Sequence, residues 1–457
     1  MPVTPEEWLP VLAKRLDAAY PRIARLRRYA TGDSDLPEMG KNLKASWQAF
    51  QKKARTDFGG LAVGALANRI RLNGIAIGGN QNHPALAVAR RIARDNRLTS
   101  QFKKAVKDYL TTSYGYLVVS SDEGRAVITR EKPEMFYAAT DPIRTWKAVA
   151  TLKVWRDEYA GKDFARVVVP GRAVLFSRAS RNTNGLAVVG AYSDDWSVVS
   201  EQEYDGDVPC IVLRRDDEMG LFEPHMDVID RINLGKLQRL VTTALQAYRQ
   251  RALKSSADSQ GLPDKDADGN DIDFRAMFEP SPGAMWELPE GLDIWESQYT
   301  DTTPMLNAEK ADARDFAAVS RTPVYVFTPE SANQSAEGAA AAKEQHVALA
   351  EDEIENIKPG LDVLMIYALR VEGVILHEDE TLDMLFVPAD RVSLSEKYAA
   401  AGQAKAAGES WDSIARNILG YSPEQIRQDA LARATEQLAI TALMGAPNGG
   451  PNPGAAA

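Results

Sequence analysis

Six apolar residues near the start of the chain recur at intervals of three and four, which is helical spacing: Trp8, Leu9, Leu12, Leu16, Ala19 and Tyr20. Thr4 and Glu7 form a capping box around Pro5, so we expect a helix to begin there. Pro21 should bend or end this helix, because proline lacks the N–H donor. Two further helical runs are predicted over 44–72 and 84–114.

Between residues 115 and 215 the pattern changes to that of β-strands. YLVVS (116–120) and RAVITR (125–130), joined by SDEG, predict a hairpin. VATLKVW, ARVVVPGRAVLF and VPCIVLRR are further runs rich in β-branched residues. We expect an antiparallel β region inside an otherwise helical chain, so the fold class is α+β.

Two long helices are predicted next, separated by a hydrophilic segment. The first covers 226–253, and the segment after it covers 254–298. The second begins with Thr303 as N-cap and Pro304 in the first helical position, and runs to about residue 322. The pattern predicts an antiparallel helix pair with a small module at its far end.

A polar stretch over 323–336 leads into the longest helical pattern of the chain, 337–371. Pro359 lies inside this pattern and should kink the helix, because its ring clashes with the carbonyl of Glu355. A strand is expected within 372–395 and helices within 396–443. The tail, 444–457, has the composition of a disordered end.

The order of these parts resembles the portal proteins of tailed double-stranded DNA bacteriophages, in particular those of long-tailed phages of actinobacteria. YATGDSDLP (29–37), FGGLAVGALANRIRLNGIAI and KPEMFYAATDP resemble the opening and the wing of that family. The succession of long helix, inserted module, proline-started helix, polar loop with SANQSAEGAAAA and kinked helix is the strongest part of the resemblance.

The resemblance implies a portal-type α+β subunit with the following parts: a mixed α/β wing (1–225), stem helices (226–253 and 299–322), a small α/β clip (254–298), a tunnel loop (323–336), a kinked spine helix (337–371), a wing return strand (372–395) and a helical crown (396–443). In that family twelve subunits form a ring at one capsid vertex of the virion, and DNA passes through it during packaging and ejection. The expected partners are further copies of the chain, DNA, terminase, head-completion or adaptor proteins, the major capsid protein and scaffold. The protein would be made in the host bacterial cytoplasm.

The resemblance also assigns roles to residues. Those of the tunnel loop would face the DNA channel: Thr328, Glu330, Ser331, Asn333 and Gln334. Those of the clip would dock partners: Asp264, Asp266, Asp268, Trp286 and Trp295. The two tryptophans have two interpretations, because they could form the core of a small β unit or anchor a partner.

The net charge of −10 argues against a tight grip on phosphate backbones, which suits a conduit through which DNA must slide. Arg231, Lys236 and Arg239 on the first long helix could form a DNA patch, a solvated face or contacts with acids of a neighbouring subunit. The overall acidity favours the subunit contacts.

The spacing of Asp264, Asp266 and Asp268 before Gly269 matches the start of a calcium-binding EF-hand loop. Position twelve of such a loop requires a bidentate carboxylate, and here it is Arg275. An exposed turn is therefore favoured over a metal site.

No enzyme signature is evident in the sequence. It contains no P-loop, no Gly-x-Ser-x-Gly and no His-Glu-x-x-His, and its single cysteine and four scattered histidines disfavour a zinc site. We expect neither cofactor nor metal, no secretory signal and no membrane span. Two alternatives remain open: a carboxylate-dependent metal nuclease or hydrolase, and another phage head or adaptor protein.

Overall fold

The computed structural model describes the following residues: 2–37, 45–78, 83–181, 188, 190–247, 251–255, 265, 292–296, 298, 300–328, 336–377, 379–390 and 394–444. The chain divides into two compact units. Unit 1 comprises Met1–Ser34, Asp57–Ile229 and Asp315–Ala457, and unit 2 comprises Asp35–Thr56 and Asp230–Arg314.

The first helix, α1 (Pro5–Tyr29), begins at the expected capping box. The Thr4 hydroxyl accepts the backbone N–H of Glu7, and the Glu7 carboxylate accepts the backbone N–H of Thr4. Leu9, Leu12 and Leu16 of the predicted stripe of this helix are buried against the five-stranded sheet described below, and Trp8 packs there in part. Tyr20, the last predicted member, is exposed instead. The prediction that Pro21 could end this helix is wrong. Ile23 and Leu26, which follow the proline, are 5% and 1% exposed, so burial along the stripe outweighs the loss of one backbone hydrogen bond.

Each of the next two predicted helical runs is broken. The run over 44–72 consists of α2 (Ala45–Ala54) and α3 (Phe58–Ala67). Asp57 separates them, because its carboxylate accepts the N–H of Gly60 and caps α3. The run over 84–114 consists of α4 (Pro84–Asp95) and α5 (Leu98–Thr112), divided where Arg97 adopts a left-handed conformation with φ of 50°.

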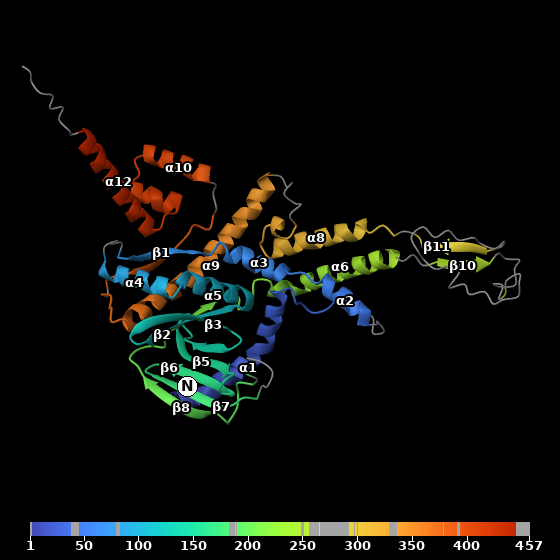
Figure 1. The fold of residues 1–457 in the computed structure, drawn as a ribbon, viewed down its shortest axis with the longest axis horizontal. Coiled ribbons are helices and arrows are strands. Elements are labelled where there is room, and N and C mark those ends of the chain that lie inside the picture. The colour runs from blue at the N-terminus through green and yellow to red at the C-terminus, as the bar shows by residue number, and fades with distance from the viewer. Residues whose placement is uncertain are drawn as a thin grey trace, which may run out of the picture. The chain divides into compact units, whose positions relative to one another are not determined.

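Unit 1 contains the expected antiparallel β region (Figure 1). One sheet has the order β3-β2-β9, with β2 at Tyr114–Asp122, β3 at Arg125–Glu131 and β9 at Cys210–Arg214. The other has the order β4-β5-β6-β7-β8, with β4 at Phe136–Thr140, β5 at Ala148–Asp157, β6 at Lys162–Val169, β7 at Arg172–Ala179 and β8 at Ser197–Glu203. The hairpin of β2 and β3 confirms the prediction for 116–130.

A third pairing in unit 1 was not predicted. Strand β1 (Leu72–Ile77) begins at the last residue of the helical run expected over 44–72. It pairs antiparallel with β12 (Leu382–Phe386), the strand expected within 372–395. The partners are more than 300 residues apart in the sequence, as the pairing of Leu72 with Phe386 shows.

The remaining helices of unit 1 follow in chain order. They include two short 3-10 turns, η1 (Glu223–His225) and η2 (Val324–Val326), and the long helix α9 (Ala336–Val371). After β12 come α10 (Leu394–Ala406), α11 (Trp411–Ser413), a π-helical turn (Ile414–Leu419) and α12 (Pro423–Met444). Among the described residues, no helix combines the length and apolarity needed to cross a membrane.

A buried polar network joins α9 to α5. The Tyr109 hydroxyl donates to Glu353, whose carboxylate also pairs with Arg215 at 2.7 Å. Asn356, one turn further along α9, donates to the same hydroxyl at 3.0 Å. Burial raises the pKa of Glu353, while Arg215 and the hydrogen bond from Tyr109 oppose the shift.

Asp362 on α9 makes the stability of unit 1 depend on pH. Its carboxylate accepts the N–H of Met384 in β12 at 2.7 Å, and burial raises its pKa to about 6. The folded state therefore binds this proton more tightly than the unfolded chain, so the carboxyl destabilises the fold progressively as pH rises from about 4 to 6.

We expect Asp362→Asn to remove this dependence, because asparagine keeps an acceptor for Met384 but does not ionise. The difference in the free energy of unfolding between the variant and the native chain should grow by about 1–2 kcal/mol in favour of the variant from pH 4 to pH 6. Thermal unfolding of both proteins across this range measures it. A difference that does not change with pH would contradict the assignment.

Unit 2 contains most of two long helices, α6 (Met226–Ala247) and α8 (Thr303–Val319), and the strand pair β10 (Arg251–Ser255) and β11 (Leu292–Glu296). Two predicted boundaries are wrong here. The helix expected over 226–253 ends at Ala247, since 251–255 pairs as a strand. The N-cap of α8 lies before Thr303, because Leu306 donates to the Thr302 carbonyl and the Asp301 carboxylate accepts the Thr303 N–H.

Candidate functional site

Ion pairs join α6 to α8 inside unit 2. Arg231 pairs with Asp312 at 3.0 Å, and Arg239 pairs with Glu309 at 2.7 Å. Arg239 follows Arg231 along α6, whereas its partner Glu309 precedes Asp312 along α8. The two helices therefore run antiparallel, as the sequence predicted. Glu309 is only 8% exposed, and a buried carboxylate is destabilising unless a cation pairs with it. The guanidinium of Arg239 provides that charge.

Lys236 lies between the two arginines on α6. Burial lowers its pKa, while the charge of Glu309 opposes the shift. The three cations predicted to contact a neighbouring subunit therefore share a strip of helix that faces acids of their own chain. Their proposed role between subunits stays a prediction, and Arg231 and Arg239 are already paired internally.

Thr328 is the one predicted channel residue that the structure describes. It follows η2, where its hydroxyl and its backbone N–H both donate to the Val324 carbonyl, at 3.3 and 3.0 Å. These two hydrogen bonds hold Thr328 against the 3-10 turn. The other four predicted channel residues lie outside the described part of the chain: Glu330, Ser331, Asn333 and Gln334.

The predicted clip residues are described only in part. Trp295 belongs to β11, where its backbone is opposite Ala252 of β10. Four others lie outside the described residues: Asp264, Asp266, Asp268 and Trp286. Pro359 lies inside α9, as predicted, with its side chain on the exposed side of the helix. The kink expected at Pro359 stays a prediction.

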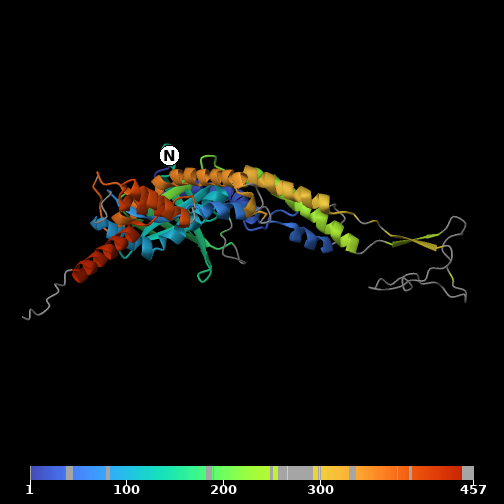
Figure 2. The ribbon, with the colours of Figure 1, turned by 90° about the horizontal axis from the view of Figure 1, so that it is seen from above.

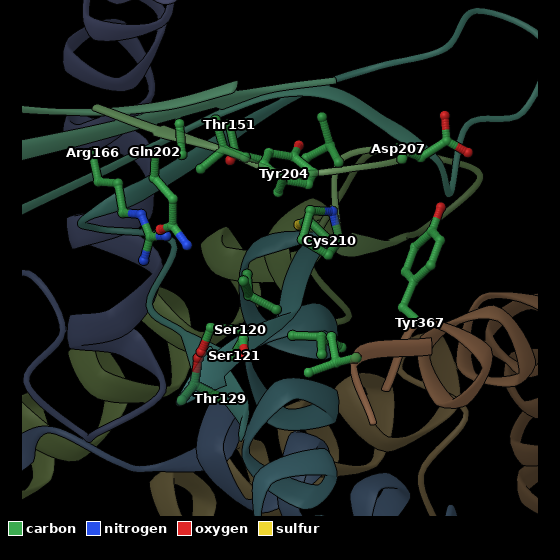
Figure 3. A pocket seen from close by; sticks show the side chains of 18 of the residues that line it. Ser120, Ser121, Thr129, Thr151, Arg166, Gln202, Tyr204, Asp207, Cys210 and Tyr367 are labelled. Atoms are coloured by element: carbon green, nitrogen blue, oxygen red, sulfur yellow. The ribbon is translucent and has the colours of Figure 1, made fainter. Parts of the chain in front are cut away.

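A pocket that the sequence analysis did not predict lies in unit 1, with a volume of about 340 Å³. Residues of both sheets and of the last turns of α9 line it (Figure 3). Figure 3 shows Arg166 and Gln202 side by side on one wall, and Ser120, Ser121 and Thr129 on the facing wall. These residues come from four strands, so only the tertiary fold brings the two walls together.

The chemistry of this pocket does not favour catalysis. Burial raises the pKa of the Cys210 thiol well above its usual value, so the thiol stays protonated and is a poor nucleophile. Burial likewise raises the pKa of Tyr367 to about 12. Glu131 is neutralised by Lys153 at 2.8 Å. In the part of the chain that the structure describes, no group of three or more His, Cys, Asp or Glu side chains could hold a metal ion.

Among solved structures, the chain is similar to a chain in the virion of a native gene transfer agent particle, with 15% identity and a TM-score of 0.45. Chains in the neck of an empty particle of this kind, computed with C6 symmetry, and of a native one, computed with C12 symmetry, are each 14% identical, with TM-scores of 0.46 and 0.42. In all three cases the match covers 87% of this chain and 99% of the other. None of the curated proteins matches.

A family profile matches almost the whole sequence. The family is described as phage portal protein, SPP1 Gp6-like, and its profile covers residues 11–410. This span includes all three sheets of unit 1, the ion-paired helices of unit 2, the long helix α9 and α10. The chain therefore belongs to the SPP1 Gp6-like family of phage portal proteins, structural and non-enzymatic components of the virion neck that form its DNA channel.

Proposed function

We propose that twelve copies of this chain close into the portal ring, with DNA passing through the central hole during packaging and ejection. The observation that carries the proposal is the match of the portal family to residues 11–410. The antiparallel pair of α6 and α8 supports it, because two ion-paired helices with a segment inserted between them have the form that a stem and its clip require.

Within this ring we assign α6 and α8 to the stem, and residues 254–298 to a clip that docks terminase first and head-completion proteins later. The segment 323–336 would form the tunnel loop and α9 the spine. Thr328 is held by Val324 at the base of that loop, so the polar residues after it would start from a fixed point. The net charge of −10 keeps the passage from gripping DNA through many phosphate contacts.

The ring can be tested on the purified full chain. We expect native mass spectrometry to give a multiple of the subunit mass of 50.1 kDa, and negative-stain images to show particles with a central hole. Terminase added to the rings should bind wild type more tightly than a variant with Trp286→Ala and Trp295→Ala. A chain that stays monomeric over a wide concentration range, or one with a divalent-metal-dependent nuclease activity, would overturn the proposal.

A further inference from the structure

Three lysines form a basic face on α5: Lys103, Lys104 and Lys107. All three side chains are exposed. Within the described residues, none of them has an acidic partner or a hydrogen bond. Three like charges within little more than one helical turn repel one another. An acidic surface that covers this face therefore lowers the free energy of the assembly.

Three acids form a matching face on α9: Glu351, Asp352 and Glu355. They too are exposed, and in the described part of the chain none is paired with a cation. Counted from its first residue, each face has charges at positions 0, +1 and +4, so the two faces present the same spacing with opposite sign.

The two faces point away from each other within one chain. Tyr109 of α5 and Glu353 of α9 are hydrogen-bonded, so these two side chains mark the sides of α5 and α9 that face each other. Lys107 is two residues from Tyr109, and Glu351 and Glu355 are each two residues from Glu353, which is about 200° around a helix. Figure 2 shows α9, in orange, along one margin of unit 1. The basic and acidic faces of one chain therefore cannot cover each other.

We propose that the basic face of α5 in one subunit docks on the acidic face of α9 in the next. The inference rests on the proposed ring and names one contact that closes it. Two different, complementary faces that point away from each other are what a head-to-tail interface needs, and such an interface generates a ring when its rotation closes. Opposite potentials also steer subunits together and set their orientation.

Charge reversal of each face gives a direct test. The variant K103E/K104E/K107E has two acidic faces, and the variant E351K/D352K/E355K has two basic faces. Each alone should lose ring assembly, with the apparent association constant reduced by at least about tenfold in 0.1 M salt. Mixed in equal amounts, they should form rings of alternating subunits, and one chain that carries all six changes should form rings alone.

Matched controls change the net charge equally at other exposed positions of unit 1. These are K14E/K162E/K405E for the lysine variant and D122K/E158K/D194K for the acid variant, and both should assemble like wild type. Sedimentation velocity measures the ring fraction. Rescue by mixing also excludes misfolding, because a misfolded chain would not assemble with a partner.

The possible results distinguish a wrong contact between the two faces from a wrong proposal of the ring. Wild-type rings together with unimpaired rings of both triple variants would overturn the contact and leave the proposed function intact. Triple variants that fail alone and also fail when mixed would overturn it too. If only the lysine variant binds DNA more weakly while assembling normally, the basic face is a DNA contact and the proposal is wrong. Absence of rings in wild type would instead overturn the proposed function.

Discussion

Replacing Arg178 with methionine should lower the free energy of unfolding by about 3–5 kcal/mol. The side chains of Arg178 and Asp163 are both fully buried, at 0% exposure, and pair at 3.2 Å between β7 and β6. Arg178 also donates to the Gly190 carbonyl at 2.7 Å, and its guanidinium lies 4.4 Å from the centre of the Trp196 ring. Without the arginine, Asp163 is left as a buried charge, and no other cation pairs with it in the part of the chain that the structure describes.

The double variant D163N/R178M is the control for this effect. It removes both charges, so most of the lost stability should return, although the contacts of Arg178 with the loop before β8 do not. Urea unfolding followed by far-UV circular dichroism measures both variants. A single variant within about 0.5 kcal/mol of wild type would show that the ion pair contributes little.

The second large effect is expected for Gly220→Ala. An added Cβ would lie 2.2 Å from the Thr111 carbonyl oxygen and 3.0 Å from its carbon, and both atoms belong to the backbone. The neighbouring Leu221 N–H donates to the Leu110 carbonyl at 2.7 Å, which holds this segment against the end of α5. Because no side-chain rotation relieves the clash, we expect a loss of about 3 kcal/mol.

Gly402→Ala in α10 is the matched control. A Cβ at Gly402 meets nothing within 4 Å, so alanine should raise stability slightly through its higher helix propensity. The two melting temperatures, measured by differential scanning calorimetry, should therefore move in opposite directions. Equal melting temperatures for both variants would refute the steric argument.

Local signals in the sequence predicted the elements whose cause is local. The capping box of Thr4 and Glu7 and the hairpin around SDEG are each complete within a few residues, and both are present. Arg97 shows the limit of this approach. Its left-handed conformation divides a run that has continuous helical periodicity, and the local sign of the break is Asn96, which caps α4 just before it.

Features that depend on distant partners could not be predicted in this way. The residues 72–77 are a strand because β12 pairs with them, and 251–255 is a strand because β11 does. Similarly, the periodicity of α6 predicted a partner helix but not that Arg231 and Arg239 would find Asp312 and Glu309 there. The pocket beside Arg166 and Gln202 is lined by residues of eight strands and of α9, so it exists only once both sheets and this helix are in place.

The pairing of β1 with β12 has a consequence for synthesis on the ribosome. Strand β1 is translated about 300 residues before the strand that completes its sheet. At about 5–20 residues per second, its open edge waits roughly 15–60 s for that partner. Ile77, fully buried in the finished unit, is exposed to nascent chains on neighbouring ribosomes during this time. The interval is long enough for chaperones to act on the growing polypeptide.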